Sequence, residues 1–271
     1  GAIRVRILEP DQPIELPDSL PADVHAELAG AEDDTTRRDT TGSPQPGIWD
    51  VVLRAPDAVR RVPGFTYIVP VPISEKRGGR IGEYLLGTWP FEGRSAREGY
   101  ETPSGLIRVT RENRDLLVSE HFVLGDFLTK GQADVWPKYV VVSPRMLDKL
   151  ELTIQELERR GHPVENVGVI SGFRHPQYNA GGGNTAGRGN LSRHMYGDAT
   201  DFFIDNDGDG RMDDLNGDGR VTVADARVMA QAAEQVERNH PTLIGGIGVY
   251  SPTGAHSGFI HIDTRGYRAR W

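Results

Sequence analysis

The sequence contains no cysteine among its 271 residues. Disulfides, thiolate metal sites, iron–sulfur clusters and thiol nucleophiles are therefore excluded. The chain also has no apolar run near the roughly 18 residues that a membrane-spanning helix needs, so no membrane span is expected. The first residue is Gly1 rather than Met. This start indicates a processed chain from which any signal peptide would already have been removed.

Positive charge is in deficit, with 31 Lys and Arg against 39 Asp and Glu and a net charge of −8. This balance argues against a nucleic-acid partner and against electrostatic docking on anionic lipid. Hydrophobic residues make up only 37% of the chain, whereas glycine (33) and proline (18) are frequent. We expect a loop-rich globular monomer with one large domain or two modest ones.

The patterns predict an α+β protein in three parts. Residues 1–47 are expected to be extended and linker-rich: 3–8 alternate like a strand, whereas 31–47 are almost free of apolar residues. Residues 48–110 hold short β-branched and aromatic runs between prolines and glycines, which is typical of a small β-rich module and its connector. We expect a second domain in 111–271.

Two helices are predicted in this second domain. The first covers 144–160, with Ser143 as N-cap, Pro144 in the first turn and Gly161 after the end. The second covers 223–238. Each carries an apolar stripe at helical spacing, Met146, Leu147, Leu150, Ile154 and Leu157 in the first and Ala226, Met229, Ala230, Ala233 and Val236 in the second. Strands are expected at 167–171, 199–204 and 259–263, and in the run at 247–250.

Candidate metal ligands lie in two of these strands. His194 and Asp201 are seven residues apart with Gly197 between them, and His261 lies near the C-terminus. Alternation places Asp201 on one face of its strand, and His261 and Asp263 together on one face of theirs. Two imidazoles and one carboxylate with an open position form a catalytic zinc set. A core histidine hydrogen-bonded to a carboxylate would explain the same pattern.

The run SRHMYGDATDF, beginning at Ser192, resembles the S-x-H-x-x-G-x-A-x-D signature of the zinc D-Ala-D-Ala carboxypeptidases and murein endopeptidases. These enzymes are relatives of lysostaphin-type peptidases and of the hedgehog domain. GFIHIDTRG, SGFRHPQYN and the order of the motifs also resemble that family, over about residues 118–271. The resemblance implies a small antiparallel sheet with flanking helices, one catalytic zinc ion on His194, Asp201 and His261, Arg174 near the scissile carbonyl, and Ser192 at the turn or on the substrate.

By this resemblance the chain would be a zinc peptidase that hydrolyses peptide bonds in bacterial cell-wall peptidoglycan, as a D,D-carboxypeptidase or endopeptidase. It would act outside the cytoplasm, in the periplasm, at the cell wall or secreted. The alternative is a catalytically inactive, metal-bearing binding module. No organic cofactor is expected, because the glycine-rich run 180–190 lacks the lysine and helix context of a phosphate-binding loop.

The general base departs from the family pattern. The family places a Glu three residues before the last ligand or a His two residues before it, whereas this chain has Gly258 and Phe259 there. Asp263, on the ligand face of its strand, and His256, in the preceding loop, are the remaining candidates. Alternatively, Asp263 only orients His261 or caps a neighbouring loop.

An acidic insertion at 205–225 matches calcium-binding loops of the D-x-[DN]-x-[DN]-G type. We expect one or two structural calcium ions, since carboxylates at this density repel one another without a cation. A solvated acidic turn is the alternative. Two overlapping loops are predicted to supply ligands, the first from Asp205, Asp207, Asp209 and Asp213 and the second from Asp214, Asn216, Asp218, Arg220 (by its carbonyl), Thr222 and Asp225. The second loop fits the whole pattern, whereas the first fits nine positions and has Asn216 in place of an acid at the twelfth.

Overall fold

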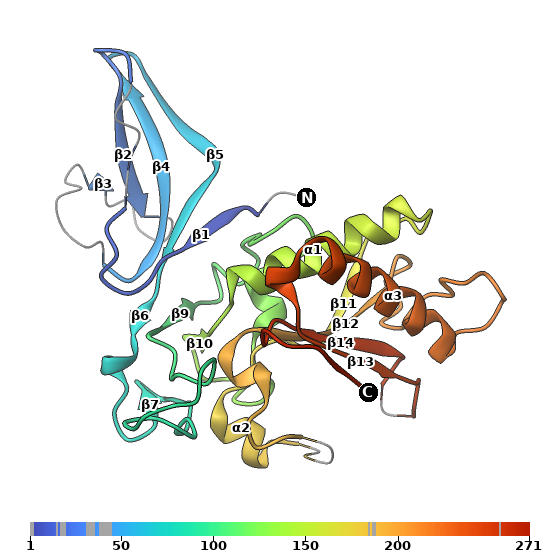
Figure 1. The fold of residues 1–271 in the computed structure, drawn as a ribbon. Coiled ribbons are helices and arrows are strands. Elements are labelled where there is room, and N and C mark those ends of the chain that lie inside the picture. Colours follow the sequence, from blue (N-terminus) through green and yellow to red (C-terminus); the bar gives the residue numbers. More distant parts are fainter. Residues whose placement is uncertain are drawn as a thin grey trace.

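The computed structural model describes residues 3–14, 16, 20–30, 36–37, 45–183, 185, 188–254 and 256–271. Within these ranges the chain is a mixed protein with several small sheets and few helices, consistent with the predicted α+β class (Figure 1). No helix in these ranges is long and apolar enough to cross a membrane.

The N-terminal sheet has the strand order β1-β5-β4-β2-β3. Its strands are β1 (Val5–Ile7), β2 (His25–Gly30), β3 (Thr36–Arg37), β4 (Gly47–Ala55) and β5 (Ala58–Val69). β4 and β5 form a long hairpin that projects away from the helices (Figure 1). Three strands of this sheet, β1, β2 and β3, thus come from residues before 47. The sequence predicted only the first of them, because the segments that form β2 and β3 are polar. Most of the predicted linker at 31–47 lies outside the described residues.

The middle of the chain forms two small sheets. One has the order β10-β9-β6 and the other pairs β7 with β8. The elements here are β6 (Val71–Pro72), η1 (Ile73–Glu75), β7 (Arg80–Ile81), β8 (Tyr84–Leu85), β9 (Gly105–Val109), η2 (Leu124–Phe127) and β10 (Lys138–Val140). Because β10 pairs with β9, the predicted boundary at residue 110 falls inside a sheet.

The two main helices form where the sequence predicts them, as α1 (Pro144–Arg159) and α3 (Val223–Asn239). All the apolar residues of both predicted stripes are buried. α1 ends at a left-handed Gly161 with φ 89°. α3 begins with a capping box, in which the Thr222 side chain accepts the Ala224 N–H and Asp225 accepts the Thr222 N–H.

The C-terminal sheet has the order β11-β12-β14-β13-β15. Its strands are β11 (Val167–Ser171), β12 (Ala199–Ile204), β13 (Gly246–Tyr250), β14 (Phe259–Asp263) and β15 (Ala269–Arg270). The pairs are antiparallel except at the edge, where β15 runs parallel to β13. Short helical segments complete the domain: α2 (Pro176–Gly181), η3 (Arg193–Tyr196) and η4 (Pro241–Leu243).

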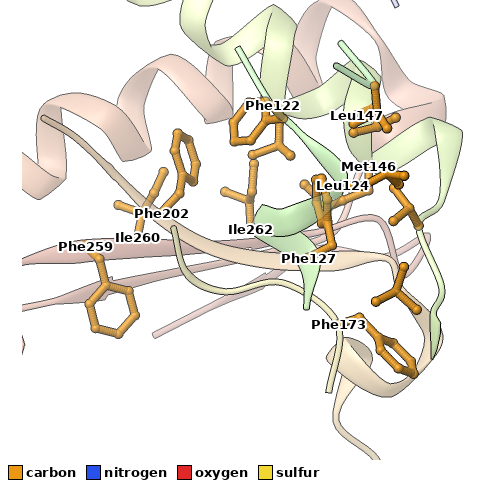
Figure 2. Packing of buried hydrophobic residues seen from close by; sticks show 14 of the residues in the cluster. Phe122, Leu124, Phe127, Met146, Leu147, Phe173, Phe202, Phe259, Ile260 and Ile262 are labelled. Carbon is orange, nitrogen blue, oxygen red and sulfur yellow. The ribbon is translucent and has the colours of Figure 1, made fainter. Parts of the chain in front are cut away.

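The two faces of this sheet have different chemistry. Phe202, Ile260 and Ile262 are fully buried on the face that α1 and α3 cover, and Figure 2 shows Phe259 pointing to the other side. Because side chains alternate along a strand, the neighbours of these residues in β12 and β14 face away from the helices. That second face receives Asp201 and His261.

Among the described glycines with a positive φ, Gly197 leaves the least room for an added Cβ. Its φ is 69°, and a Cβ there would lie 2.4 Å from the Val141 carbonyl oxygen. Gly161 also has a positive φ, but its Cβ would meet nothing within 4 Å.

Gly161→Ala should cost about 1–2 kcal/mol of unfolding free energy. Gly197→Ala should cost about 1–3 kcal/mol more, because the added methyl group overpacks the turn. Urea unfolding of both variants measures the difference; equal losses would contradict the steric argument.

Candidate metal centre

The centre is built on two adjacent strands. Asp201 of β12 lies directly opposite His261 of β14 in the antiparallel register. Directly opposed residues on one face of such a pair have neighbouring side chains. The distance between His261 Nδ1 and Asp201 Oδ1 is 2.7 Å. Two of the three predicted ligands are therefore brought together by strand pairing alone.

His194 enters from the turn that precedes β12. It lies on η3, and the left-handed Gly197 at the end of η3 reverses the chain so that the imidazole returns toward Asp201. His194 Nε2 lies 3.3 Å from Asp201 Oδ1 and 3.2 Å from His261 Nδ1. The predicted triad therefore converges, and these three buried or half-buried residues could hold a metal ion.

The outer nitrogen of each imidazole is already engaged. His194 Nδ1 lies 2.7 Å from the Gly172 carbonyl oxygen, to which it must donate. His261 Nε2 lies 3.0 Å from Asp263 Oδ2. These contacts leave His194 Nε2, His261 Nδ1 and Asp201 Oδ1 facing one another. Each of these three atoms can offer a lone pair, and there is room for at most one proton between them. A divalent cation would satisfy all three, so this donor set fits zinc.

The electrostatics of the triad agree with this assignment. Burial lowers the pKa of His194, which keeps its inward nitrogen unprotonated. Burial alone would raise the pKa of Asp201, but His194 and His261 outweigh it and hold that pKa far below its ordinary value. Burial opposes the charge on His261, whereas Asp201 and Asp263 on its two sides raise its pKa. The carboxylates on the two sides of His261 thus favour a positive charge at this point between the two strands.

Asp263 lies behind His261, on the side away from the triad. It is fully buried, and its oxygens accept from His261, from the Gly246 N–H at 2.8 Å and from the guanidinium of Arg265. Burial raises its pKa, but His261 and Arg265 hold it far below the ordinary value. A carboxylate engaged in this way is poorly placed to take a proton from a substrate-side water. The geometry favours the alternative reading, in which Asp263 orients His261, over the role of general base.

Arg174 reaches the centre. Its Nη2 lies 3.9 Å from Asp201 Oδ2, and its backbone N–H donates to the His194 carbonyl. Its Nε is buried with no hydrogen-bond partner in the described residues. Ser192 stands at the start of η3, where its carbonyl, rather than its side chain, accepts the Met195 N–H. Arg174 thus has donor capacity left for a ligand, whereas Ser192 shapes the turn through its backbone.

His256 lies in the loop that precedes β14. It lines a cavity of about 780 Å³ with the acidic insertion and with Pro252, Thr253, Gly254 and Ser257. Its Nδ1 lies 2.7 Å from the Ser257 carbonyl oxygen, and its ring packs edge-on against Phe259, which shares a face of β14 with His261. The contacts found for His256 in the described residues do not include any member of the triad, and its role as general base stays a prediction.

Two aromatic side chains beside His261, Trp271 and Tyr250, were not predicted to lie near the centre. The indole of Trp271 lies 5.2 Å from the His261 ring, and its Nε1 donates to Tyr250 Oη at 2.7 Å. Gly248, which is opposite His261 in β13, makes room for this indole, because a Cβ there would lie 2.5 Å from Trp271 Nε1. No local spacing signals this contact, since it depends on how β13, β14 and β15 pair.

Buried ion pairs around the centre were also missed. Arg193 and Asp198 flank His194 in sequence and pair with each other, with Nε–Oδ2 at 3.0 Å. Lys149 of α1 is fully buried and donates to Glu237 of α3 and to the Asp263 carbonyl, both at 2.7 Å. The sequence offered one signal for these ion pairs: Lys149 is a charged residue next to the apolar stripe of the first predicted helix, where it needs a partner if it is buried.

The acidic insertion separates into two unlike loops. Carboxylate oxygens of Asp205, Asp207 and Asp209 converge within 4.8 Å and could hold a second ion. In the second predicted loop, by contrast, Asp225 is buried as part of the α3 capping box with Thr222, and Asp214 accepts three backbone N–H groups. Asn216, Asp218 and Arg220 are exposed.

Comparison of the chain with models of protein families, with curated proteins and with solved structures finds no match. The resemblance of residues 118–271 to zinc peptidases therefore rests on their sequence motifs alone.

Zinc affinity tests whether Asp263 supports His261. Asp263→Asn should weaken zinc binding about 10–100-fold, because the outer partner of a metal-bound imidazole orients the ring and raises its basicity. Asp198→Asn is the matched control, since Asp198 is also a buried carboxylate paired with an arginine but does not contact the triad. Its zinc affinity should equal that of the wild type. Competition with a chromophoric chelator measures both; equal losses would mean that general destabilisation, rather than support of His261, sets the affinity.

Proposed function

We propose that the chain is a zinc-dependent peptidase that hydrolyses peptide bonds in bacterial cell-wall peptidoglycan, of the D,D-carboxypeptidase or endopeptidase type. The observation that carries the proposal is the convergence of His194 Nε2, His261 Nδ1 and Asp201 Oδ1, with both outer imidazole nitrogens already hydrogen-bonded. The hydrolase class follows from this donor set, and the cell-wall substrate follows from the motif resemblance.

Zinc held by these three residues would polarise a peptide carbonyl and acidify a water molecule. The protein's part is to keep the ligands in position. Gly172 and Asp263 fix the two rings from behind, and strand pairing fixes Asp201. Asp201, His261 and Arg174 each retain slight side-chain exposure, whereas His194 is almost completely buried. We therefore expect a substrate to approach beside Arg174.

Arg174 is the residue best placed to bind the substrate. Burial lowers its pKa, and the Asp201 carboxylate opposes that shift. The guanidinium remains a cation with an unused buried Nε. Preorganised donors in a partly dry site stabilise an oxyanion without reorganising, so Arg174 would hold the carbonyl oxygen of the scissile bond or a terminal carboxylate.

A second candidate function is favoured by two observations: Asp263 is fully engaged, and the contacts found for His256 in the described residues do not include the triad. A metal-bearing module that binds wall peptides without turnover needs no general base. Peptide binding to the zinc-loaded chain without product release would support this alternative.

The direct test is incubation of the zinc-loaded chain with purified peptidoglycan and with a peptide ending in D-Ala-D-Ala. Released D-Ala indicates a carboxypeptidase, and new amino groups without free D-Ala indicate an endopeptidase. 1,10-Phenanthroline should abolish release, and added zinc should restore it. Arg174→Gln should lower the rate about 10²–10³-fold while zinc stays bound, as when one oxyanion donor is removed. Zinc content without release from either substrate would overturn the peptidase.

The role of Asp263 can be separated from zinc affinity by working at saturating zinc. Under that condition Asp263→Asn should keep most of the wild-type turnover, because the variant still accepts from His261. Loss of a general base costs about 10²–10⁴-fold. A loss of that size with zinc fully bound would restore Asp263 as the base and contradict the orienting role.

A further inference from the structure

The first half of the acidic insertion leaves β12 at its C-terminal end, and Figure 1 shows the insertion as the orange loop between β12 and α3. Asp205 follows β12 directly. Carboxylate oxygens of Asp205, Asp207 and Asp209 lie within 4.8 Å of one another. Asp213 lies beside this group: its N–H donates to the Ile204 carbonyl at 3.0 Å, and its Oδ2 accepts the Asn206 N–H at 3.0 Å.

One oxygen in this group is unexplained without a cation. Asp205 is only 5% exposed, and its Oδ1 is buried with no hydrogen-bond partner in the described residues. Its Oδ2 accepts the Gly210 N–H at 3.2 Å. A buried carboxylate oxygen among like charges is unfavourable unless a positive charge joins it.

The second half of the insertion has no such oxygen. Asp214 accepts N–H groups from Gly217, Asp218 and Gly219, and both oxygens of Asp225 accept backbone N–H groups, from Asn216 at 3.0 Å and Thr222 at 2.7 Å. Each of the four carboxylate oxygens of Asp214 and Asp225 thus has at least one backbone donor. The sequence pattern fits this second loop through its twelfth position and the first loop over nine positions only, whereas the unpartnered oxygen lies in the first.

The first loop also contacts the segment that leads into β14. The Met212 N–H donates to Ser257 Oγ at 2.6 Å. A Cβ on Gly258 would lie 2.5 Å from Met212 Cε, so the two segments are in direct contact at this point, beside the cavity that they line together. One end of this contact follows Asp201 on β12, and the other precedes His261 on β14.

We propose that the Asp205–Asp213 loop binds one calcium ion through Asp205, Asp207, Asp209 and Asp213, and that this ion fixes the end of β12 against the segment before β14. An all-oxygen set of carboxylates suits a hard cation, and calcium tolerates the irregular geometry of a loop better than magnesium does. The inference stands apart from the peptidase activity, because calcium binding needs neither zinc nor turnover.

Calorimetric titration of the full chain with calcium tests the site. One ion should bind with a Kd of about 10⁻⁵–10⁻³ M, and magnesium at the same concentration should bind more weakly. Asp209→Asn and Asp218→Asn form a matched pair: both residues are exposed, and each accepts the N–H two residues on, at 2.8 and 2.9 Å. Asp209→Asn should weaken calcium binding at least about tenfold, whereas Asp218→Asn should leave it within about twofold.

Asp205→Asn separates a ligand from a structural carboxylate. It removes one charge from the cluster but keeps an oxygen for the Gly210 N–H. The calcium-free variant should therefore melt at the wild-type temperature or above it, and calcium should no longer raise its Tm. A lower Tm without calcium would show that the carboxylate is structural by itself. That result would overturn the site. Absence of calcium binding, or loss of binding in Asp218→Asn alone, would overturn it as well.

Amide hydrogen exchange tests the connection to β14. Calcium should slow exchange at Met212 and at 256–258 in the wild type, while the distant β2–β4 pair stays unchanged as an internal control. Ser257→Ala removes the acceptor of the Met212 N–H and should abolish the effect at 256–258 without changing the calcium affinity more than about twofold. Calcium binding with unchanged exchange at 256–258 in the wild type would overturn the connection and leave a local site only.

Discussion

The convergence of three donor atoms on one point beside β12 and β14 is the constraint on which the candidate centre depends. His194 Nε2, His261 Nδ1 and Asp201 Oδ1 lie 2.7–3.3 Å apart, and the outer nitrogens of both imidazoles are hydrogen-bonded. Strand pairing and the Gly197 turn bring these groups together from three places in the chain. The fold therefore preorganises the donor set that a divalent cation would bind.

The buried charges behind the centre explain how it stays in place. Lys149, Glu237 and the carbonyl of Asp263 connect both long helices to β14, and Arg265 completes the shell around the Asp263 carboxylate. Each of these charges has a partner at hydrogen-bonding distance. A paired buried charge gives little net stability, but removing one partner is costly, so such networks hold one arrangement against its alternatives. His261 thereby receives a rigid support from the helix layer.

The two candidate ion sites differ in ligand chemistry as well as in position. The centre on the sheet is rich in imidazole, which suits zinc, whereas the loop after β12 offers carboxylate oxygens alone, which suit calcium. Asp201 of the first site lies within β12, and Asp205 of the second directly follows the end of that strand. The strand with Asp201 is thus constrained by the sheet along its length and by the acidic loop at its end.

The sequence by itself determined the parts that depend on local periodicity. The stripes of α1 and α3, the strands 199–204 and 259–263, and the placement of Asp201 and His261 on one face each follow from spacings of a few residues. It also identified Gly197 as the turn before Asp201, because the glycine lies between the two ligands in the chain.

Tertiary structure alone decided the rest. The register of β12 on β14, the place of Asp263 behind His261, and the contact of Met212 with Ser257 join residues far apart in the chain. The use of Asp225 as a helix cap also appeared only in the structure, because the sequence pattern assigned this residue to a calcium loop. Polar β2 was missed because its place in the sheet comes from pairing with β4 and not from its own composition. The spacing of residues along a strand predicts which face of the strand a side chain occupies. Which residue contacts that side chain depends on how the strands and helices pack.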